Sequence, residues 1–281
     1  MNVVLDPIMI LFFGWGIAGA AIATVIGNLF GAAYYICYFL KGKSVLSIHP
    51  KDFTIKNGVC SGVLAIGIPA SLGSLLLNLS HIVVNSQMAN YSDMAVAGMG
   101  VAMKVTLMTV TICMGMGQGV QPLLGYCVGA RTWGRFKKVL KFSLLFALVL
   151  GIVMTLLYYL CTGPMVKMFL TDDAAYNYGV QFTHILLSTS SLFGVFYVLC
   201  NTLQAMGAAT AAVIVNLSRQ GIIYIPTVFI LQKILGVTGL VWAQPIADFL
   251  ATLLVVVLYL YTIRKMEGST EVEIVEAGSN V

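Results

Sequence analysis

The sequence predicts an all-α fold: a polytopic transmembrane helical bundle with one complete six-helix lobe and the last helical hairpin of another lobe. The composition excludes an ordinary soluble domain, because 59% of the 281 residues are hydrophobic and only 9% are charged, against about 25% charged in soluble proteins. Seven apolar segments are long enough to cross a hydrocarbon core of about 30 Å. A weak internal repeat further relates the first segment to the last.

The seven predicted spans are separated by short polar loops. In chain order they cover 16–40, 58–89, 94–127, 139–163, 176–206, 208–232 and 236–263. The segment 1–14 would extend only about 21 Å as a helix, which is too short to cross a bilayer. We therefore expect it to be the end of a helix.

Basic residues predict the orientation, because lysine and arginine are enriched in cytoplasmic loops. Two loops and the end of the last span lie on one predicted side, and only Lys167 and Lys233 lie on the other. The basic residues of the first side are Lys41, Lys43, Lys51, Lys56, Arg131, Arg135, Lys137, Lys138, Lys141, Arg264 and Lys265. We assign this side to the cytoplasm, which places the C-terminus there in a multi-pass protein of the plasma (inner) membrane.

An internal repeat links the segments 16–28 and 236–248. Gly16, Gly19, Ala23 and Ile26 recur as identical residues at a constant offset of 220. Both copies follow a proline-containing apolar helix and lead to a basic end. They share one orientation, as in transporters built from parallel repeats.

The repeat sets the expected domain organisation. Residues 1–40 are the end of an N-terminal lobe (a partial fifth helix and a sixth helix), and 41–57 form a cytoplasmic linker between lobes. Residues 58–265 form a C-terminal six-helix lobe, and the acidic segment 266–281 is a disordered cytoplasmic tail. The offset predicts that about 160 residues of the first lobe are missing before Met1.

Asp6 is the most informative ionisable residue, because charges inside a membrane are costly and usually functional. Asn2 lies one helical turn before it on the same face. With a turn near Trp15, Thr24 lies at a similar depth on the next helix, about 13 Å below the outer surface. A carboxylate, an amide oxygen and a hydroxyl suit Na⁺, and a desolvated aspartate could instead carry a proton. A purely structural role for Asp6 is the alternative.

Three other charges, Lys104, Arg219 and Asp248, lie roughly 16 Å into their helices. Lys104 could pair with an acid or extend to the interface. Arg219 could bond to backbone at a helix break near Gly221, or pair with Asp248. The spacing does not choose among these arrangements.

Polar stripes and methionines outline a candidate substrate cavity. Ser71, Ser74, Asn78, His81 and Asn85 recur every three or four residues on one helix, and Gln181, His184, Ser188 and Ser191 do so on another. Cavity lining and interhelical hydrogen bonding both explain such stripes. In 94–127, flexible methionines suit a promiscuous pocket, with ordinary core filling as an equal alternative, and Gly115 and Gly119 form a G-x-x-x-G motif for close packing. The predicted cavity residues are Ser74, Asn78, His81, Asn85, Met103, Gln118, Gln121, His184 and Ser188.

Other classes of chemistry have little support. None of the six cysteines has the C-x-x-C spacing of metal sites, so we assign no disulfide and no metal beyond Na⁺. No arrangement of a nucleophile and a base appears, and an enzyme is not expected. The net charge of +5 comes mainly from loops, which does not indicate nucleic-acid binding.

Several segments together resemble the multidrug and toxic compound extrusion (MATE) family of antiporters. They are the stretches 2–7, 16–24, 67–69, 118–130 and 219–221, and the resemblance covers 2–266. It implies twelve helices in two lobes around a central cavity, with this chain running from the end of the fifth helix through the twelfth. It also implies that Asn2, Asp6 and Thr24 belong to a cation site. Some members carry a glutamate on the seventh helix, where this chain has Leu77 and Asn78.

The resulting prediction is a secondary antiporter that exports amphipathic or cationic drugs or metabolites in exchange for H⁺ or Na⁺. It needs no cofactor beyond the coupling ion, works in the lipid bilayer, and is monomeric when full length. Two alternatives are a lipid-linked oligosaccharide flippase of the same superfamily, which would want a strongly cationic cavity, and a membrane fragment that does not transport.

Overall fold

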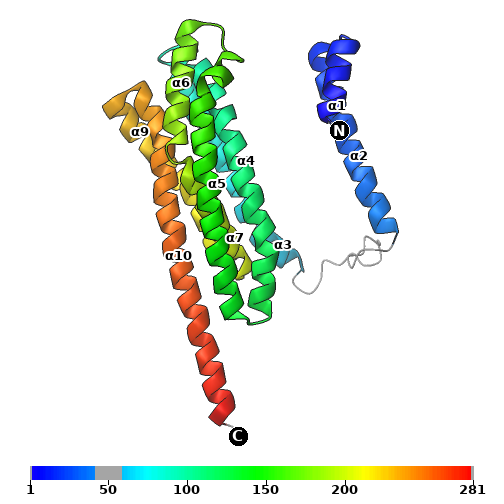
Figure 1. The fold of residues 1–281 in the computed structure, drawn as a ribbon, viewed down its shortest axis with the longest axis vertical. Coiled ribbons are helices and arrows are strands. Elements are labelled where there is room, and N and C mark those ends of the chain that lie inside the picture. Colours follow the sequence, from blue (N-terminus) through cyan, green and yellow to red (C-terminus); the bar gives the residue numbers. More distant parts are fainter. Residues whose placement is uncertain (1, 42–58, 280–281) are drawn as a thin grey trace. The chain divides into compact units, whose positions relative to one another are not determined.

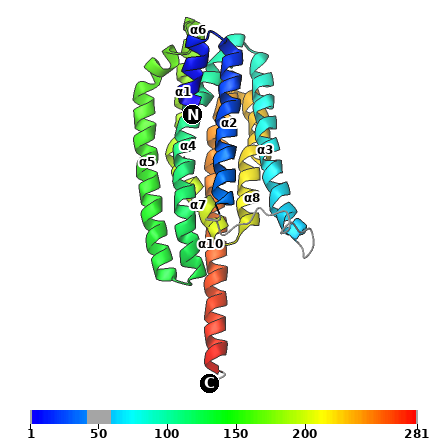
Figure 2. The ribbon, with the colours of Figure 1, turned by 90° about the vertical axis from the view of Figure 1, so that its right-hand side faces the viewer.

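The computed structural model describes residues 2–41 and 59–279, and every regular element in these ranges is a helix. The chain divides into two compact units, residues 1–62 and 63–281, with the boundary in the first turn of α3 (Val59–Ala89). In Figures 1 and 2 the described helices are coloured along the sequence, from blue at the N-terminus to red at the C-terminus. The all-α prediction is confirmed.

Unit 1 is a helical hairpin. Its first arm is α1 (Asn2–Pro7) followed by the π-helix η1 (Ile8–Phe12), and its second arm is α2 (Gly16–Leu40). The chain reverses at Gly14 and Gly16, whose φ angles of +66° and +51° favour glycine. A Cβ on Gly19 would lie 3.0 Å from the carbonyl oxygen of Met9, so the two arms approach closely there.

Unit 2 holds the remaining six predicted spans, all of which are helical. After α3 come α4 (Asp93–Gly129), α5 (Trp133–Lys167), α6 (Asp173–Leu187), α7 (Ser190–Ala205), α8 (Ala209–Leu217), the π-helix η3 (Ser218–Ile222), α9 (Tyr224–Leu235) and α10 (Val237–Ser279). Two spans are interrupted. The helices α6 and α7 meet at a 45° bend and, taken as a pair, are long and apolar enough for one span, while η3 joins α8 to α9.

Among the described residues, five helices are long and apolar enough to cross a membrane, and the bent pair α6–α7 would be a sixth span. The turns between spans are capped locally. Ser92 accepts a hydrogen bond from the Met94 amide at the start of α4. Asp172 accepts from the amides of Ala174 and Ala175 at the start of α6. Such caps satisfy backbone N–H groups that the helix itself leaves free.

Small residues let the helices of unit 2 approach at their backbones. A Cβ on Gly98 of α4 would lie 2.9 Å from the amide nitrogen of Gly179 on α6, and one on Gly117 would lie 2.9 Å from the Tyr197 carbonyl oxygen on α7. The prediction that Gly115 and Gly119 make the close contact is wrong, because each faces open space. They lie two residues from Gly117, which rotates them off the face that packs on α7.

The C-terminal segment differs from the prediction of disorder. In Figure 1, α10 continues as a helix beyond the other helices of unit 2, and it ends at Ser279. Extending an existing helix needs no new nucleation, and the glutamates of this segment are good helix formers.

Candidate functional site

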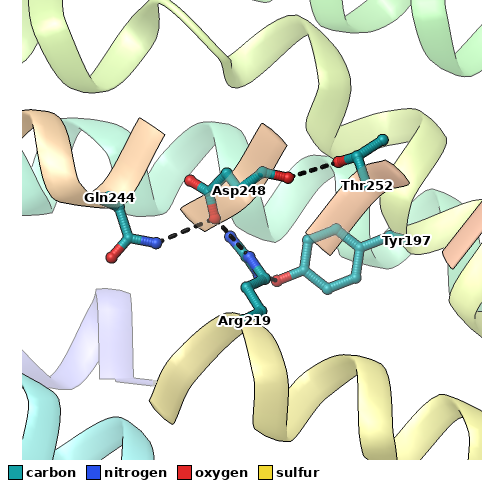
Figure 3. Close-up of polar contacts among 5 residues, drawn as sticks. All are labelled: Tyr197, Arg219, Gln244, Asp248 and Thr252. Atoms are coloured by element: carbon teal, nitrogen blue, oxygen red, sulfur yellow. Dashed lines mark hydrogen bonds and ion pairs between the residues drawn. The ribbon is translucent and has the colours of Figure 1, made fainter. Parts of the chain in front are cut away.

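A buried ion pair lies in the interior of unit 2 (Figure 3). Arg219 on η3 donates from Nε to Oδ1 of Asp248 on α10 at 2.6 Å, and the two side chains are only 6% and 3% exposed. Gln244, one turn earlier on α10, also donates to Oδ1 at 3.0 Å. The structure thus decides between the alternatives for Arg219: it pairs with Asp248, next to the predicted helix break.

Three aromatic rings surround the Arg219 guanidinium. Its Cζ lies 5.3, 4.8 and 5.6 Å from the ring centroids of Phe193, Phe196 and Tyr197, all on α7. Nη1 also donates to the Tyr197 hydroxyl at 3.1 Å. Cation–π contacts of this kind stabilise a desolvated guanidinium. The pair therefore ties η3 to both α7 and α10.

The second carboxylate oxygen of Asp248 is buried and has no hydrogen-bond partner among the described residues. A buried acceptor without a donor is costly. Asp248 and Arg219 also line a cavity of about 310 Å³. Apart from this pair, the cavity wall is mostly apolar, with Met99, Met103 and Met114 contributed by α4.

A second cavity of about 420 Å³ lies beside the first and shares Met114 and Tyr197 with it. Five carboxamide side chains line it, and no Asp, Glu, Lys or Arg is found among its described lining residues. The five are Gln118, Gln121, Asn201, Gln204 and Asn216.

Four of the nine predicted cavity residues line one of the two cavities. His81 and Met103 line the first cavity, and Gln118 and Gln121 line the second. Asn78 and Asn85 lie on the exposed side of α3, away from the buried Ser80, Val84 and Met88. The side chain of Ser74 lies outside the described residues.

His184 and Ser188 do not line either cavity, contrary to the prediction. The imidazole of His184 stacks on Tyr159 of α5, with ring centroids 4.1 Å apart. Ser188 donates to the Ile185 carbonyl oxygen at 2.6 Å, at the bend between α6 and α7. The contacts of these two residues lie within the helix packing and at the bend.

Lys104 does not pair with any described acid. Its Nζ lies 5.5 Å from the ring centroid of Phe169, just beyond the end of α5, and its side chain is exposed. The side chain therefore reaches toward the end of the helices. This agrees with the expectation that Lys104 extends to the membrane interface.

In unit 1, Asp6 is half-buried on α1, and its Oδ1 is buried without a hydrogen-bond partner among the described residues. Thr24 is exposed on α2 and donates to the Ala20 carbonyl oxygen at 2.9 Å. The contact of Gly19 with Met9 sets the register of the two arms. Counted from this contact, Asp6 lies level with about residue 22. That position is roughly 3 Å along the helix from the predicted partner, Thr24. Asn2 belongs to α1, but its side chain lies outside the described residues.

Several functional candidates were not predicted. Tyr197, Asn201 and Gln204 follow each other at spacings of four and three on α7, and this helical periodicity could have revealed them. Gln244 precedes Asp248 and Thr252 at spacings of four on α10, so the same periodicity could have revealed it, whereas Asn216 on α8 has no polar residue three or four positions before it.

The comparisons with known proteins agree with this architecture. The sequence profile of the MatE family matches residues 69–230. The chain is 32% identical over 253 residues to a multidrug export protein, MepA, of Staphylococcus aureus, covering 90% of this chain and 56% of that protein. It is 26% identical to the Staphylococcus saprophyticus protein of the same name, covering 98% of the chain and 60% of that protein. The chain thus spans little more than half the length of these relatives.

Two solved structures share the fold. The Vibrio cholerae MATE transporter VcmN in its bent form superposes with a TM-score of 0.77 at 22% identity, over 94% of this chain and 60% of that one. An outward-facing multidrug resistance MATE family transporter superposes with a TM-score of 0.81 at 19% identity, over 96% and 60%. With the family profile matched over more than half of its length, the chain belongs to the MatE family of membrane transporters.

Proposed function

We propose that this chain is part of a secondary active antiporter that exports amphipathic or cationic organic compounds in exchange for H⁺ or Na⁺. The observation that carries the proposal is the half-buried Asp6 of an apolar hairpin, whose Oδ1 is buried and has no hydrogen-bond partner in the part of the chain that the structure describes. Such an oxygen gains most from binding a proton or a cation. The similarity to Staphylococcus proteins named multidrug export proteins supports the choice of substrate class.

Antiport requires that the ion and the substrate prefer different conformations of the protein. In this proposal, Asp6 with Asn2 and Thr24 binds the ion, and the change in charge shifts the balance between inward-open and outward-open states. Thr24 keeps its oxygen lone pairs for a cation, because its hydroxyl proton is already donated to Ala20.

The described charges favour an antiporter over a lipid-linked oligosaccharide flippase. A diphosphate would require free cationic side chains in the cavity. Arg219 is committed to Asp248, and Lys104 lies against Phe169. The basic loops support an inner-membrane protein with a cytoplasmic C-terminus.

The test is ethidium efflux from proteoliposomes that contain the full-length protein, driven in turn by a proton gradient and by a sodium gradient. We expect Asp6→Asn to abolish gradient-driven efflux while the protein still inserts and folds. Asp93→Asn is the matched control, because Asp93 is an exposed acid in the first turn of α4. Undiminished efflux by Asp6→Asn would overturn the assignment, and efflux by the full-length protein but not by this chain alone would favour the fragment that does not transport.

A further inference from the structure

The two cavities of unit 2 lie along the same surfaces of two helices. On α4, the lining residues Met99, Met103, Val110 and Met114 are followed at helical spacing by Gln118 and Gln121. On α7, Phe193 leads in the same way through Tyr197 to Asn201 and Gln204. Both surfaces therefore change from apolar to carboxamide, and they change at the level of Met114 and Tyr197, which border both cavities.

Two of the five carboxamides, Asn201 and Asn216, present hydrogen-bond acceptors to the polar cavity, while Gln121 donates to the side-chain oxygen of Gln204 at 3.4 Å. The side-chain nitrogen of Asn201 already donates to the Tyr197 carbonyl oxygen at 2.8 Å. That of Asn216 donates to the Ala212 carbonyl oxygen at 2.9 Å and to Cys200 Sγ at 3.3 Å. Each residue thus retains its side-chain oxygen for a ligand.

We infer that these cavities form one ligand site for amphipathic compounds whose polar end carries N–H or O–H donors, selected by hydrogen bonding rather than by charge. This inference rests on the proposed export function and specifies its substrate class. The donor-bearing end lies among Gln118, Asn201 and Asn216, and the apolar body lies against the methionines of the neighbouring cavity. Volumes of about 420 and 310 Å³ suit a small organic molecule, and flexible methionines adapt to different shapes.

The basis for selection is the cost of an unpaired acceptor. A ligand without donors would cover the Asn201 and Asn216 oxygens and leave them without partners. Sites built to bond a polar group discriminate strongly against an analogue that lacks it. No full charge lies among the described residues of the polar cavity, and the two charges that line the neighbouring cavity, Arg219 and Asp248, neutralise each other, so we expect charge to contribute little to this choice.

A matched pair of dyes tests the inference. Rhodamine 123 and tetramethylrhodamine methyl ester have the same cationic core and ester, but only the first carries N–H donors. The chain is placed in nanodiscs of neutral lipid with no ion gradient, and the dyes are titrated by fluorescence anisotropy against empty nanodiscs. We expect rhodamine 123 to bind about tenfold more tightly, which corresponds to roughly 1.4 kcal/mol.

Variants locate the preference. Gln118→Leu and Asn216→Leu are expected to reduce the preference for rhodamine 123, whereas Met103→Gln is expected to weaken both dyes equally. Gln118 is exposed and makes no internal hydrogen bond to a described residue, so its variant remains informative if Asn216→Leu fails to fold. Gln181→Leu is the control, because Gln181 is exposed on α6 and lines neither cavity.

Equal affinity for the two dyes would overturn the inference, as would an unchanged preference in the Gln118→Leu variant. The result is separable from that of the proposed function, because binding is measured without transport. Asp6→Asn should retain the dye preference even where it abolishes efflux. Conversely, efflux that depends on Asp6 with no dye preference would leave the antiporter proposal standing and remove only this one.

Discussion

Arg219 Nε lies 2.6 Å from Asp248 Oδ1, in an ion pair that joins η3 to α10 and is almost fully buried. The pair reaches α7 as well, through the Tyr197 hydroxyl. Three separate segments of unit 2, α7, η3 and α10, are therefore joined through one neutralised pair of charges.

Removing either partner alone should destabilise unit 2, because it leaves an uncompensated buried charge. We expect Arg219→Met and Asp248→Leu each to cost about 3–5 kcal/mol, and the double variant to recover most of that loss. Thermal unfolding of the purified chain in detergent, followed by intrinsic fluorescence, measures the effect. Single variants as stable as the unmodified chain would show that the pair contributes nothing to stability.

Gly117 and its neighbours allow a test of backbone packing within one helix. Gly117→Ala should lower the melting temperature, since its Cβ would lie 2.9 Å from the Tyr197 carbonyl oxygen. Gly115→Ala and Gly119→Ala face open space and should be neutral or stabilising by up to about 1 kcal/mol, because alanine is the better helix former. The three variants are compared by thermal unfolding. An equal response from all three would contradict the close contact of α4 with α7.

The internal repeat predicts paired responses at positions 220 residues apart. Gly16 and Gly236 both have positive φ, at +51° and +61°. Three residues later, a Cβ on Gly19 would lie 3.0 Å from the Met9 carbonyl oxygen, and one on Gly239 would overlap the carbonyl oxygen of Leu231. We expect Gly19→Ala to destabilise unit 1 and Gly239→Ala to destabilise unit 2, with the larger loss of stability for Gly239→Ala.

Expression and monodispersity in size-exclusion chromatography give the readout for these variants. Gly31→Ala on α2 is the control, because its Cβ would face open space. If Gly239→Ala behaved like Gly31→Ala, the close approach of α9 and α10 would be wrong.

His184 should tolerate replacement by another ring. Because it stacks on Tyr159 at 4.1 Å between ring centroids, His184→Phe should keep the stability within about 0.5 kcal/mol, whereas His184→Ala should lose about 1 kcal/mol or more. Proton-driven efflux by the full-length protein should survive His184→Phe. Loss of coupling in a stable His184→Phe protein would instead make His184 a proton carrier.

Helical segments were accessible from the sequence because they depend on local properties. A run of about 20 apolar residues must satisfy its own backbone hydrogen bonds in lipid, and only a helix does so within one segment. All seven predicted spans are accordingly helical, although their ends differ. The repeated Gly16 and Gly236 were visible for a similar reason, since a tight reversal requires glycine at a fixed position.

The contacts between helices were harder to predict from the sequence. Helical periodicity shows which residues share a face but not which neighbour that face meets. Two polar stripes therefore looked alike in the sequence. In the structure, His184 stacks on Tyr159, whereas His81 lines a cavity.

The repeat also shows where the two hairpins differ. Thr24 corresponds to Gln244, and both positions are polar. In unit 1 the acid is Asp6, on the first arm of its hairpin, and its Oδ1 has no partner among the described residues. In unit 2 the acid is Asp248, on the second arm, where Gln244 and Arg219 bind it.

The sequence by itself determined the membrane-spanning helical class, the repeat and the set of costly intramembrane charges, because each follows from composition or spacing along the chain. Only the tertiary structure decided that Arg219 neutralises Asp248, that Gly117 rather than Gly115 or Gly119 packs on α7, and that α4, α7 and α8 together form a carboxamide cavity. These are relations between helices, and they depend on the rotation and depth of each helix against its neighbours, which local spacing does not specify.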